Sequence, residues 1–164
     1  MKKSTNNRPR IALFEPRIPQ NTGTIGRSCL AFELSLDIIK PTGFSFEDKY
    51  LKRAGLDYWC NVDYHLYESF DDYKHQFKTS RIIALTKKSD HSISDIIYKN
   101  TDILLFGRED TGLPDVIMNK SDLIAGIPMP GGENKLKDGG VRSLNLSVAC
   151  GIVSYTACIQ LNLL

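Results

Sequence analysis

Short, largely apolar runs alternate along the chain with longer segments of mixed polarity. The runs fall at 11–14, 36–39, 81–86, 103–106 and 123–128. Because apolar residues follow one another without a regular polar alternation, these runs are typical of strands buried on both faces of a parallel sheet. The intervening segments predict helices at 22–32, 47–54, 67–78 and 113–119. The pattern therefore predicts an α/β fold, a mostly parallel sheet with helices on both faces.

The stretch from Ser143 to Leu164 contains no charged residue. Its length would suffice for a membrane span, but it carries many polar side chains and no basic flank follows it. Those polar residues are Ser143, Asn145, Ser147, Ser154, Thr156, Gln160 and Asn162. We therefore predict a buried helix. Because this helix is apolar nearly all round, one side should face the core and the other a second subunit.

Length and composition limit the classes of protein to which the chain can belong. The chain has 164 residues, which predicts one domain over 10–164, preceded by a basic arm at 1–9. With 41% hydrophobic and 24% charged residues, it is neither a disordered tail, a collagen-like fibre nor a coiled coil. The net charge of +2 is too weak to argue for or against nucleic acid. Residues 1–10 lack the apolar region of a secretory signal, so we expect a cytoplasmic protein.

The cysteines and histidines predict no metal site. Cys29, Cys60, Cys150 and Cys158 form no C-x-x-C pair, and no histidine stands at zinc-ligand spacing from any of them. Cys150 and Cys158 are separated by about 12 Å of helical rise, too far for a disulfide. We expect buried, reduced thiols.

Ligands of parallel α/β sheets bind outside the carboxyl ends of the strands. In the first loop at this edge, Asn21 is a good N-cap, and Gly23 and Gly26 fall inside the expected helix. Each glycine costs about 1 kcal/mol relative to alanine, and a close approach of another group would explain that cost. Arg27 either reaches a phosphate from the first turns of this helix or is an ordinary exposed arginine.

Two further loops carry unusual residues. Gly107 directly follows a strand, where a ligand could approach the backbone. Glu109 and Asp110 are either acid/base groups or solvated loop charges. Ser143 and Asn145 stand where the uncharged helix begins, and either cap it or form one wall of a ligand site.

Tyr58 and Trp59 are an aromatic pair outside these loops. They either stack on a nucleic-acid base or anchor a loop onto the core.

Motifs in a fixed order along the chain carry a resemblance to a known family. They are Glu15-Pro16, Ile18-Pro19, Asn21-Thr22-Gly23, Arg27, Pro41, Gly43-Phe44, Asp48-Lys49, Arg53-Ala54-Gly55-Leu56-Asp57-Tyr58, Phe106-Gly107, Glu109, Gly112-Leu113-Pro114, Ile127-Pro128-Met129 and Ser143-Leu144-Asn145-Leu146-Ser147. Over residues 10–161 the chain resembles the SPOUT superfamily of RNA methyltransferases, and most closely its single-domain TrmL (YibK-like) branch. That branch contains tRNA 2′-O-methyltransferases that act on the anticodon wobble nucleotide.

The resemblance implies a SPOUT-type sheet with a C-terminal deep trefoil knot, against the general rule that chains are unknotted. The knot would hold S-adenosyl-L-methionine in a bent form, leaving S-adenosyl-L-homocysteine as product, without a metal. By position, the implied cofactor contacts are Leu85, Thr86, Gly107, Ile127, Met129, Ser143 and Leu144. The resemblance also implies a homodimer through the first and last helices.

The implied reaction moves a methyl group from a sulfonium to a ribose 2′-hydroxyl, a poor nucleophile until its proton is removed. The resemblance assigns catalysis to Arg27, surrounded by Asn21, Glu109, Ser143 and Asn145. Arginine is normally protonated, so two versions stay open. Arg27 accepts the proton after a bound RNA phosphate alters its basicity, or it orients phosphate and hydroxyl while phosphate or water takes the proton.

The implied partner is tRNA, bound at its anticodon stem-loop. Basic residues expected to contact its phosphates are Lys2, Lys3, Arg8, Arg10, Lys49, Lys52 and Arg53. The segment 131–140 is longer than the family's usual loop, and glycine pairs at its ends predict a mobile flap. Three alternatives remain: the same reaction at another tRNA or rRNA position, a catalytically silent knotted RNA-binding module, and an unrelated flavodoxin-like phosphate binder.

Overall fold

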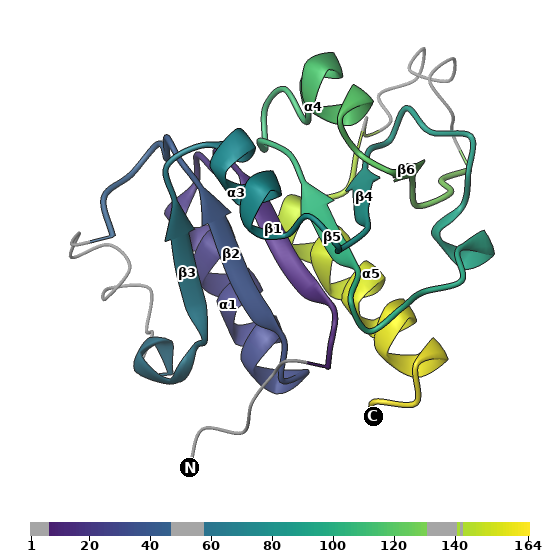
Figure 1. Ribbon diagram of the computed structural model, residues 1–164, viewed down its shortest axis with the longest axis horizontal. Coiled ribbons are helices and arrows are strands. Elements are labelled where there is room, and N and C mark those ends of the chain that lie inside the picture. The colour runs from purple at the N-terminus through teal and green to yellow at the C-terminus, as the bar shows by residue number, and fades with distance from the viewer. Residues whose placement is uncertain (1–6, 47–57, 131–140, 142) are drawn as a thin grey trace.

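A six-stranded, all-parallel sheet organises the molecule (Figure 1). The computed structural model describes residues 7–46, 58–130, 141 and 143–164. In the order β3-β2-β1-β5-β4-β6, the strands are β1 (Arg10–Phe14), β2 (Ser35–Ile39), β3 (Tyr64–Tyr67), β4 (Ile82–Leu85), β5 (Ile103–Phe106) and β6 (Leu123–Ala125). The helices are α1 (Pro19–Ala31), α3 (Phe70–Gln76), α4 (Asp115–Asn119) and α5 (Leu146–Gln160), with short 3-10 turns η1 (Trp59–Asn61) and η2 (Ile93–Asp95). The predicted α/β class and parallel sheet are confirmed.

Helices cover both faces of the sheet, which explains the continuous apolar runs. Ile11 and Leu13 of β1 point to the face where α1 and α5 pack, behind the sheet in Figure 1. Ala12 and Phe14 point to the opposite face, against α3 and α4. Because both faces of the central strands are covered, most positions along them are apolar, and the buried Asp37 of β2 is an exception.

The edge beyond β2 differs from the prediction. The helix expected over 67–78 is shorter, and the strand β3 precedes it with Leu66 paired to Ile38 of β2. α3 begins after Ser69, whose side chain accepts a hydrogen bond from the Asp72 N–H. The strand was missed because its side chains are mostly exposed, so it lacks the apolar run of a central strand. The helix expected at 47–54 lies outside the described residues.

The first helix also begins earlier than predicted. Pro19 occupies its first turn, where the missing N–H and fixed φ of proline are favourable. Asn21 is therefore not the N-cap; it lies inside the helix with only 8% of its surface exposed. Its side chain is held by long-range partners, described below, which local sequence rules do not anticipate.

The last helix has two different sides, as predicted. Cys150, Val153 and Ala157 are buried against the core. The opposite side leaves a stripe of large apolar side chains at the surface; its members are Val148, Ile152, Tyr155 and Ile159. No helix in the described residues is long and apolar enough to cross a membrane.

Three of the four thiols match their prediction. Cys29, Cys150 and Cys158 are buried, and burial raises the pKa of Cys150 to about 12. Cys60 is exposed, so the prediction was wrong for that residue, which lies in η1 at the surface.

Two of the arginines that were expected to bind RNA form hydrogen bonds within the protein. Arg10 belongs to β1 and forms two hydrogen bonds, of 2.7 and 2.6 Å, to the buried carboxylate of Asp37. Arg8 donates to the carbonyls of Phe32 (2.9 Å) and Leu163 (3.4 Å), which follow α1 and α5. A guanidinium at the carboxyl ends of helices complements their dipoles. The guanidinium groups of both residues are therefore engaged within the protein. Lys2, Lys3, Lys49, Lys52, Arg53 and the segment 131–140 lie outside the described residues.

Replacing Arg8 by alanine should destabilise the protein moderately. It removes both carbonyl hydrogen bonds and an ion pair with Glu33 (3.0 Å), but the guanidinium is partly exposed and water can replace it. We expect a loss of about 1 kcal/mol in the free energy of unfolding, or roughly 2–4 °C in Tm. Thermal denaturation measures this effect, with Lys78→Ala as an exposed-cation control. An unchanged Tm would show that Arg8 does not connect the two helix ends.

Candidate functional site

A cavity of about 340 Å³ opens at the carboxyl ends of β4, β5 and β6, next to the start of α5. All residues predicted to contact a cofactor line it. They are Leu85, Thr86, Gly107, Ile127, Met129, Ser143 and Leu144. Segments far apart in sequence therefore converge where ligands of parallel sheets bind. Its volume falls at the lower end of the range typical of small-molecule sites.

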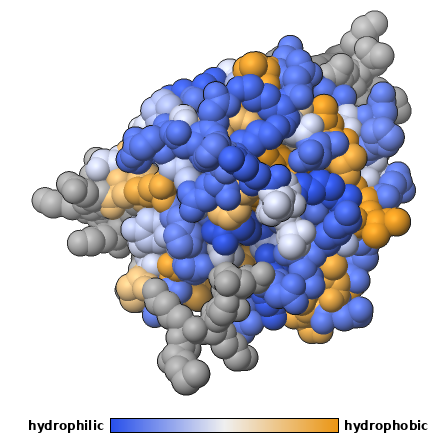
Figure 2. Space-filling view, viewed as in Figure 1, coloured by the Kyte–Doolittle hydropathy of each residue, from blue (hydrophilic) through white to orange (hydrophobic). Residues whose placement is uncertain are grey.

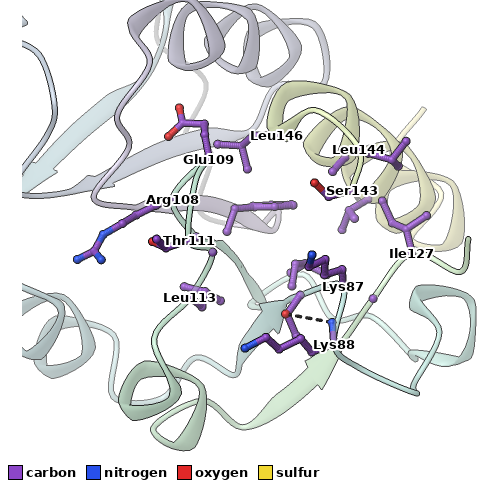
Figure 3. Close-up of a pocket in the computed structure, with 18 of the residues that line it drawn as sticks. Lys87, Lys88, Arg108, Glu109, Thr111, Leu113, Ile127, Ser143, Leu144 and Leu146 are labelled. Carbon is purple, nitrogen blue, oxygen red and sulfur yellow. Dashed lines mark hydrogen bonds between the residues drawn. The ribbon is translucent and has the colours of Figure 1, made fainter. Parts of the chain in front are cut away.

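Figure 3 shows how the cavity is built. Ile127, Ser143 and Leu144 lie at one side, and Leu113 and Thr111 lie across from them. Lys87 and Lys88 close a third side, where the Lys88 N–H donates to the Thr86 hydroxyl at 3.3 Å. The lining combines an apolar surface with a few polar groups, as small-molecule sites commonly do.

The loop after β5 is tight, and this tightness accounts for its glycines. A Cβ at Gly107 would lie 2.2 Å from the carbonyl carbon of Gly112. Gly112 has φ 70° and exchanges backbone hydrogen bonds with Arg108 at 3.1 and 2.9 Å. Gly107 does line the cavity, as predicted. The reason differs, since the loop's own backbone fills the space of its missing side chain.

A polar network joins this loop to the first and last helices. Glu109 accepts hydrogen bonds from the N–H groups of Arg17 (2.8 Å) and Ile18 (3.0 Å), and Asn21 Nδ2 lies 3.4 Å from it. Asn145 Nδ2 donates to Asn21 Oδ1 at 3.1 Å. The amino end of α1, expected to attract a phosphate, thus already faces the protein's own carboxylate.

Asn145 has two roles in this network. Its Oδ1 accepts from the N–H groups of Ser147 (2.8 Å) and Val148 (3.4 Å) and so caps α5, which confirms the capping interpretation. Its Nδ2 contacts Asn21. Asn21, Glu109 and Asn145 are therefore brought together, and Ser143 lines the cavity close by in sequence.

Asp110 differs from its neighbour Glu109. It is exposed, and a hydrogen bond from the Thr111 backbone N–H lowers the pKa of its carboxyl group. Asp110 therefore matches the interpretation of a solvated loop charge, whereas Glu109 is fixed by three donors.

Arg27 is not among the residues that line the cavity. It lies on α1, exposed, with its guanidinium carbon 5.7 Å from the centre of the Tyr58 ring. Asn21 on the same helix is six residues earlier, about 9 Å along the axis. The structure thus brings four of the five residues expected to be catalytic to one region and places Arg27 farther along the helix.

Sequence reasoning missed an ion cluster beside the cavity. Glu15 has φ 47°, and its carboxylate accepts from Arg108 Nε at 3.0 Å and from Arg108 Nη2, with Arg17 Nη2 3.5 Å away. The signal was the sequence Glu15-Pro16 directly after a buried strand, where a charged residue is unusual. In the described ranges, no group of three or more His, Cys, Asp or Glu residues is placed to hold a metal ion.

Comparison with known proteins defines the class to which this fold and site belong. The chain belongs to the SpoU rRNA Methylase family, which matches residues 8–155. The tRNA (cytidine(34)-2′-O)-methyltransferase of Yersinia pestis is 41% identical over 156 residues, covering 92% of this chain and 93% of that protein. That of Methylovorus glucosotrophus is 37% identical over 147 residues, covering 90% and 92%.

Solved structures agree with this assignment. One that concerns the 2-OH methylation of C/U34 on tRNA superimposes with a TM-score of 0.86 and 37% identity, covering 96% of this chain and 98% of that chain. The SpoU methyltransferase AviRb from Streptomyces viridochromogenes, in complex with AdoMet, has a TM-score of 0.81 at 19% identity, covering 96% of this chain and 59% of that one. The second likeness concerns the fold alone.

Proposed function

We propose that the protein is an S-adenosyl-L-methionine-dependent tRNA 2′-O-methyltransferase that modifies the ribose of wobble nucleotide 34. The observation that carries the proposal is the convergence of the turns at Leu85, Gly107, Ile127 and Ser143 on one cavity. The cavity lies beside the Glu109–Asn21–Asn145 network. The relatives named for 2′-O-methylation of cytidine 34 support the choice of substrate.

The lining residues fit the proposed cofactor. S-adenosyl-L-methionine combines an aromatic base, a ribose and an amino-acid tail, and supplies a methyl group on a sulfonium when bound. Leu85, Ile127 and Leu144 provide apolar surface for a flat base. Main-chain groups at Gly107 and Met129, with the Ser143 hydroxyl, are suited to orient the polar parts.

The protein's own residues would position the ribose and manage its proton. In this proposal, Glu109 and Asn21 hold the start of α1 against the loop after β5, so that the helix carrying Arg27 keeps a fixed direction. Arg27 then acts on the RNA, since it does not line the cofactor cavity. Both versions of its role remain: proton acceptor, or positioner of phosphate and hydroxyl.

The trefoil knot is part of the same proposal. Gly126, which follows β6, is hydrogen-bonded to His91 and Ile93 of the segment after β4, at 2.8 and 2.9 Å. A Cβ at Gly126 would lie 2.5 Å from the Thr86 carbonyl oxygen. From β6 at the sheet edge, the chain then returns to α5, which packs on β5 and α1. Such close backbone contact between the two segments supports threading of one past the other.

We also propose a homodimer formed through α1 and α5. The apolar stripe of α5 is half exposed: Val148 by 50%, Tyr155 by 54% and Ile159 by 50%. α1 lies beside α5 and exposes Ile18 at its start. Burial of this stripe against a second copy would remove a costly apolar surface from water. Sedimentation equilibrium tests the dimer, and a monomer at micromolar concentration would contradict it.

Mapping of 2′-O-methyl groups at nucleotide resolution tests the proposed function. Unmodified tRNA is incubated with the protein and S-adenosyl-L-methionine, and with the protein alone as a control. A cofactor-dependent methyl group at position 34 is expected. A methyl group at another position instead would show that the enzyme modifies a nucleotide other than the wobble nucleotide. Cofactor binding in calorimetry without methylation of any RNA would indicate a silent RNA-binding module. The proposed location is the cytoplasm, with one domain over 10–164.

A further inference from the structure

The middle of α1 is in contact with the aromatic pair of Tyr58 and Trp59. Gly23 and Gly26 of the helix face this pair, and Arg27 follows them. A Cβ at Gly26 would lie 2.4 Å from Trp59 Cζ3, so the indole ring occupies the space of a side chain. At Gly26, the close approach predicted from the helical glycines is therefore made by the protein's own indole ring, whereas Gly23 contributes its backbone carbonyl as an acceptor for Tyr58. The interpretation of Tyr58 and Trp59 as an anchor is confirmed, since both pack against the core.

The Tyr58 ring is held mainly by packing against the core, and its hydroxyl adds a hydrogen bond. Its hydroxyl donates to the carbonyl of Gly23 at 3.2 Å, and its backbone leads directly into η1. Burial raises the pKa of Tyr58, and the nearby charge of Arg27 offsets only part of that shift. The phenol therefore keeps its proton near neutral pH and remains a hydrogen-bond donor.

The fixed ring presents its face to the Arg27 guanidinium. The 5.7 Å between the guanidinium carbon and the ring centre is within the range of a cation–π contact. In the described part of the chain, this contact is the one recorded for the guanidinium, and no hydrogen bond or ion pair engages it. Without the ring, an exposed arginine would sample several rotamers, at an entropic cost for any reaction that needs one of them.

We propose that Tyr58 is a positioning residue for Arg27: it holds the guanidinium, by its ring face, in the orientation used on the RNA substrate. This inference rests on the proposed function, because it gives Tyr58 a role only if Arg27 acts in methyl transfer. It also accounts for Gly26 within α1, since the missing side chain lets Trp59, the neighbour of Tyr58, approach the helix backbone beside Arg27.

The contact itself is tested by NMR in the absence of RNA and cofactor. A proton above a ring face is shifted upfield, so the Arg27 Nε–H signal, identified by its loss in Arg27→Lys, should be upfield in the wild type. In Tyr58→Leu it should move to the value of an exposed arginine, and in Tyr58→Phe it should stay. Tyr64→Leu is the matched control, since Tyr64 lies 5.1 Å from Trp59 in the same aromatic cluster. An Arg27 signal unchanged by Tyr58→Leu would overturn the proposal.

The functional consequence is tested by tRNA methylation kinetics. Tyr58→Leu should lower kcat by about tenfold, because misorientation of a reacting group is costly. KM for tRNA and cofactor affinity should change little, kcat is compared well below the Tm of each variant, and Tyr58→Phe should restore most of kcat. A wild-type kcat in Tyr58→Leu, while the wild type methylates position 34 normally, would refute the role of Tyr58. Failure of the proposed function would look different: the wild type itself would produce no 2′-O-methyl group.

Discussion

Arg27→Ala is expected to abolish methyl transfer to tRNA while leaving S-adenosyl-L-methionine affinity nearly unchanged. Arg27 is exposed and outside the lining of the cavity, so its removal alters no wall of the proposed cofactor site. It would, however, remove the group proposed to orient or deprotonate the 2′-hydroxyl. Such groups contribute roughly 10²- to 10⁴-fold to rate. Single-turnover methylation at saturating cofactor measures the rate, and calorimetry measures the affinity.

Two variants make the Arg27 result interpretable. Lys78→Ala removes an exposed cation far from α1 in sequence and should leave turnover intact, which controls for loss of general phosphate attraction. Arg27→Lys keeps the charge but loses the planar fork, so it separates the effect of charge from that of geometry. Unchanged turnover in Arg27→Ala would remove this residue from the mechanism.

Asp37→Asn is expected to cause the largest loss of stability. The Asp37 carboxylate is fully buried and accepts hydrogen bonds from Arg10 Nε (2.7 Å), Arg10 Nη2 (2.6 Å) and the Tyr73 hydroxyl (2.8 Å). Burial alone would lower the pKa of Arg10, but the hydrogen bond and charge of Asp37 raise it above its ordinary value. Removal of the negative partner leaves a guanidinium without its counter-ion, which typically costs about 3–5 kcal/mol.

Denaturant unfolding followed by circular dichroism measures this loss, with a fall in Tm of roughly 10 °C as its thermal counterpart. Asp90→Asn makes the same chemical change at an exposed position and should stay within about 0.5 kcal/mol of the wild type. A loss below about 1 kcal/mol in Asp37→Asn would show that solvent or rearrangement satisfies Arg10, contrary to its position beside a buried carboxylate.

The sequence predicted strands well where both faces of the strand are buried. The runs at 11–14 and 103–106 predicted their strands closely, because residues covered on both faces must be apolar throughout. Tyr64–Tyr67 was missed because an exposed edge strand has no such requirement. Asp37, the polar residue inside an otherwise apolar run, was a signal of a buried ion pair that periodicity alone does not interpret.

Site prediction depended on the family resemblance more than on local chemistry. No local rule links Asn21 to Asn145, which are 124 residues apart in sequence and 3.1 Å apart between side-chain atoms. The role of Gly107 was attributed to a ligand because the sequence does not reveal that Gly112 folds back onto it. Arg8 and Arg10 were read as RNA contacts because their carbonyl and carboxylate partners come from distant segments.

The ion pair between Arg81 and Asp102 lies directly before β4 and β5, at the amino ends of these strands and opposite the cavity at their carboxyl ends. The pair of Arg10 and Asp37 joins β1 to β2 in the same way, and neither pair lines the cavity. Seen from the side of Figure 1, the surface is mostly hydrophilic with scattered hydrophobic patches (Figure 2). The ion pairs that stabilise the strands and the cavity proposed to bind the cofactor are thus formed by different residues of the same sheet. Random substitutions confined to the residues that line the cavity should therefore leave many variants folded. This makes the chain a practical starting point for engineering enzymes that methylate other nucleotides.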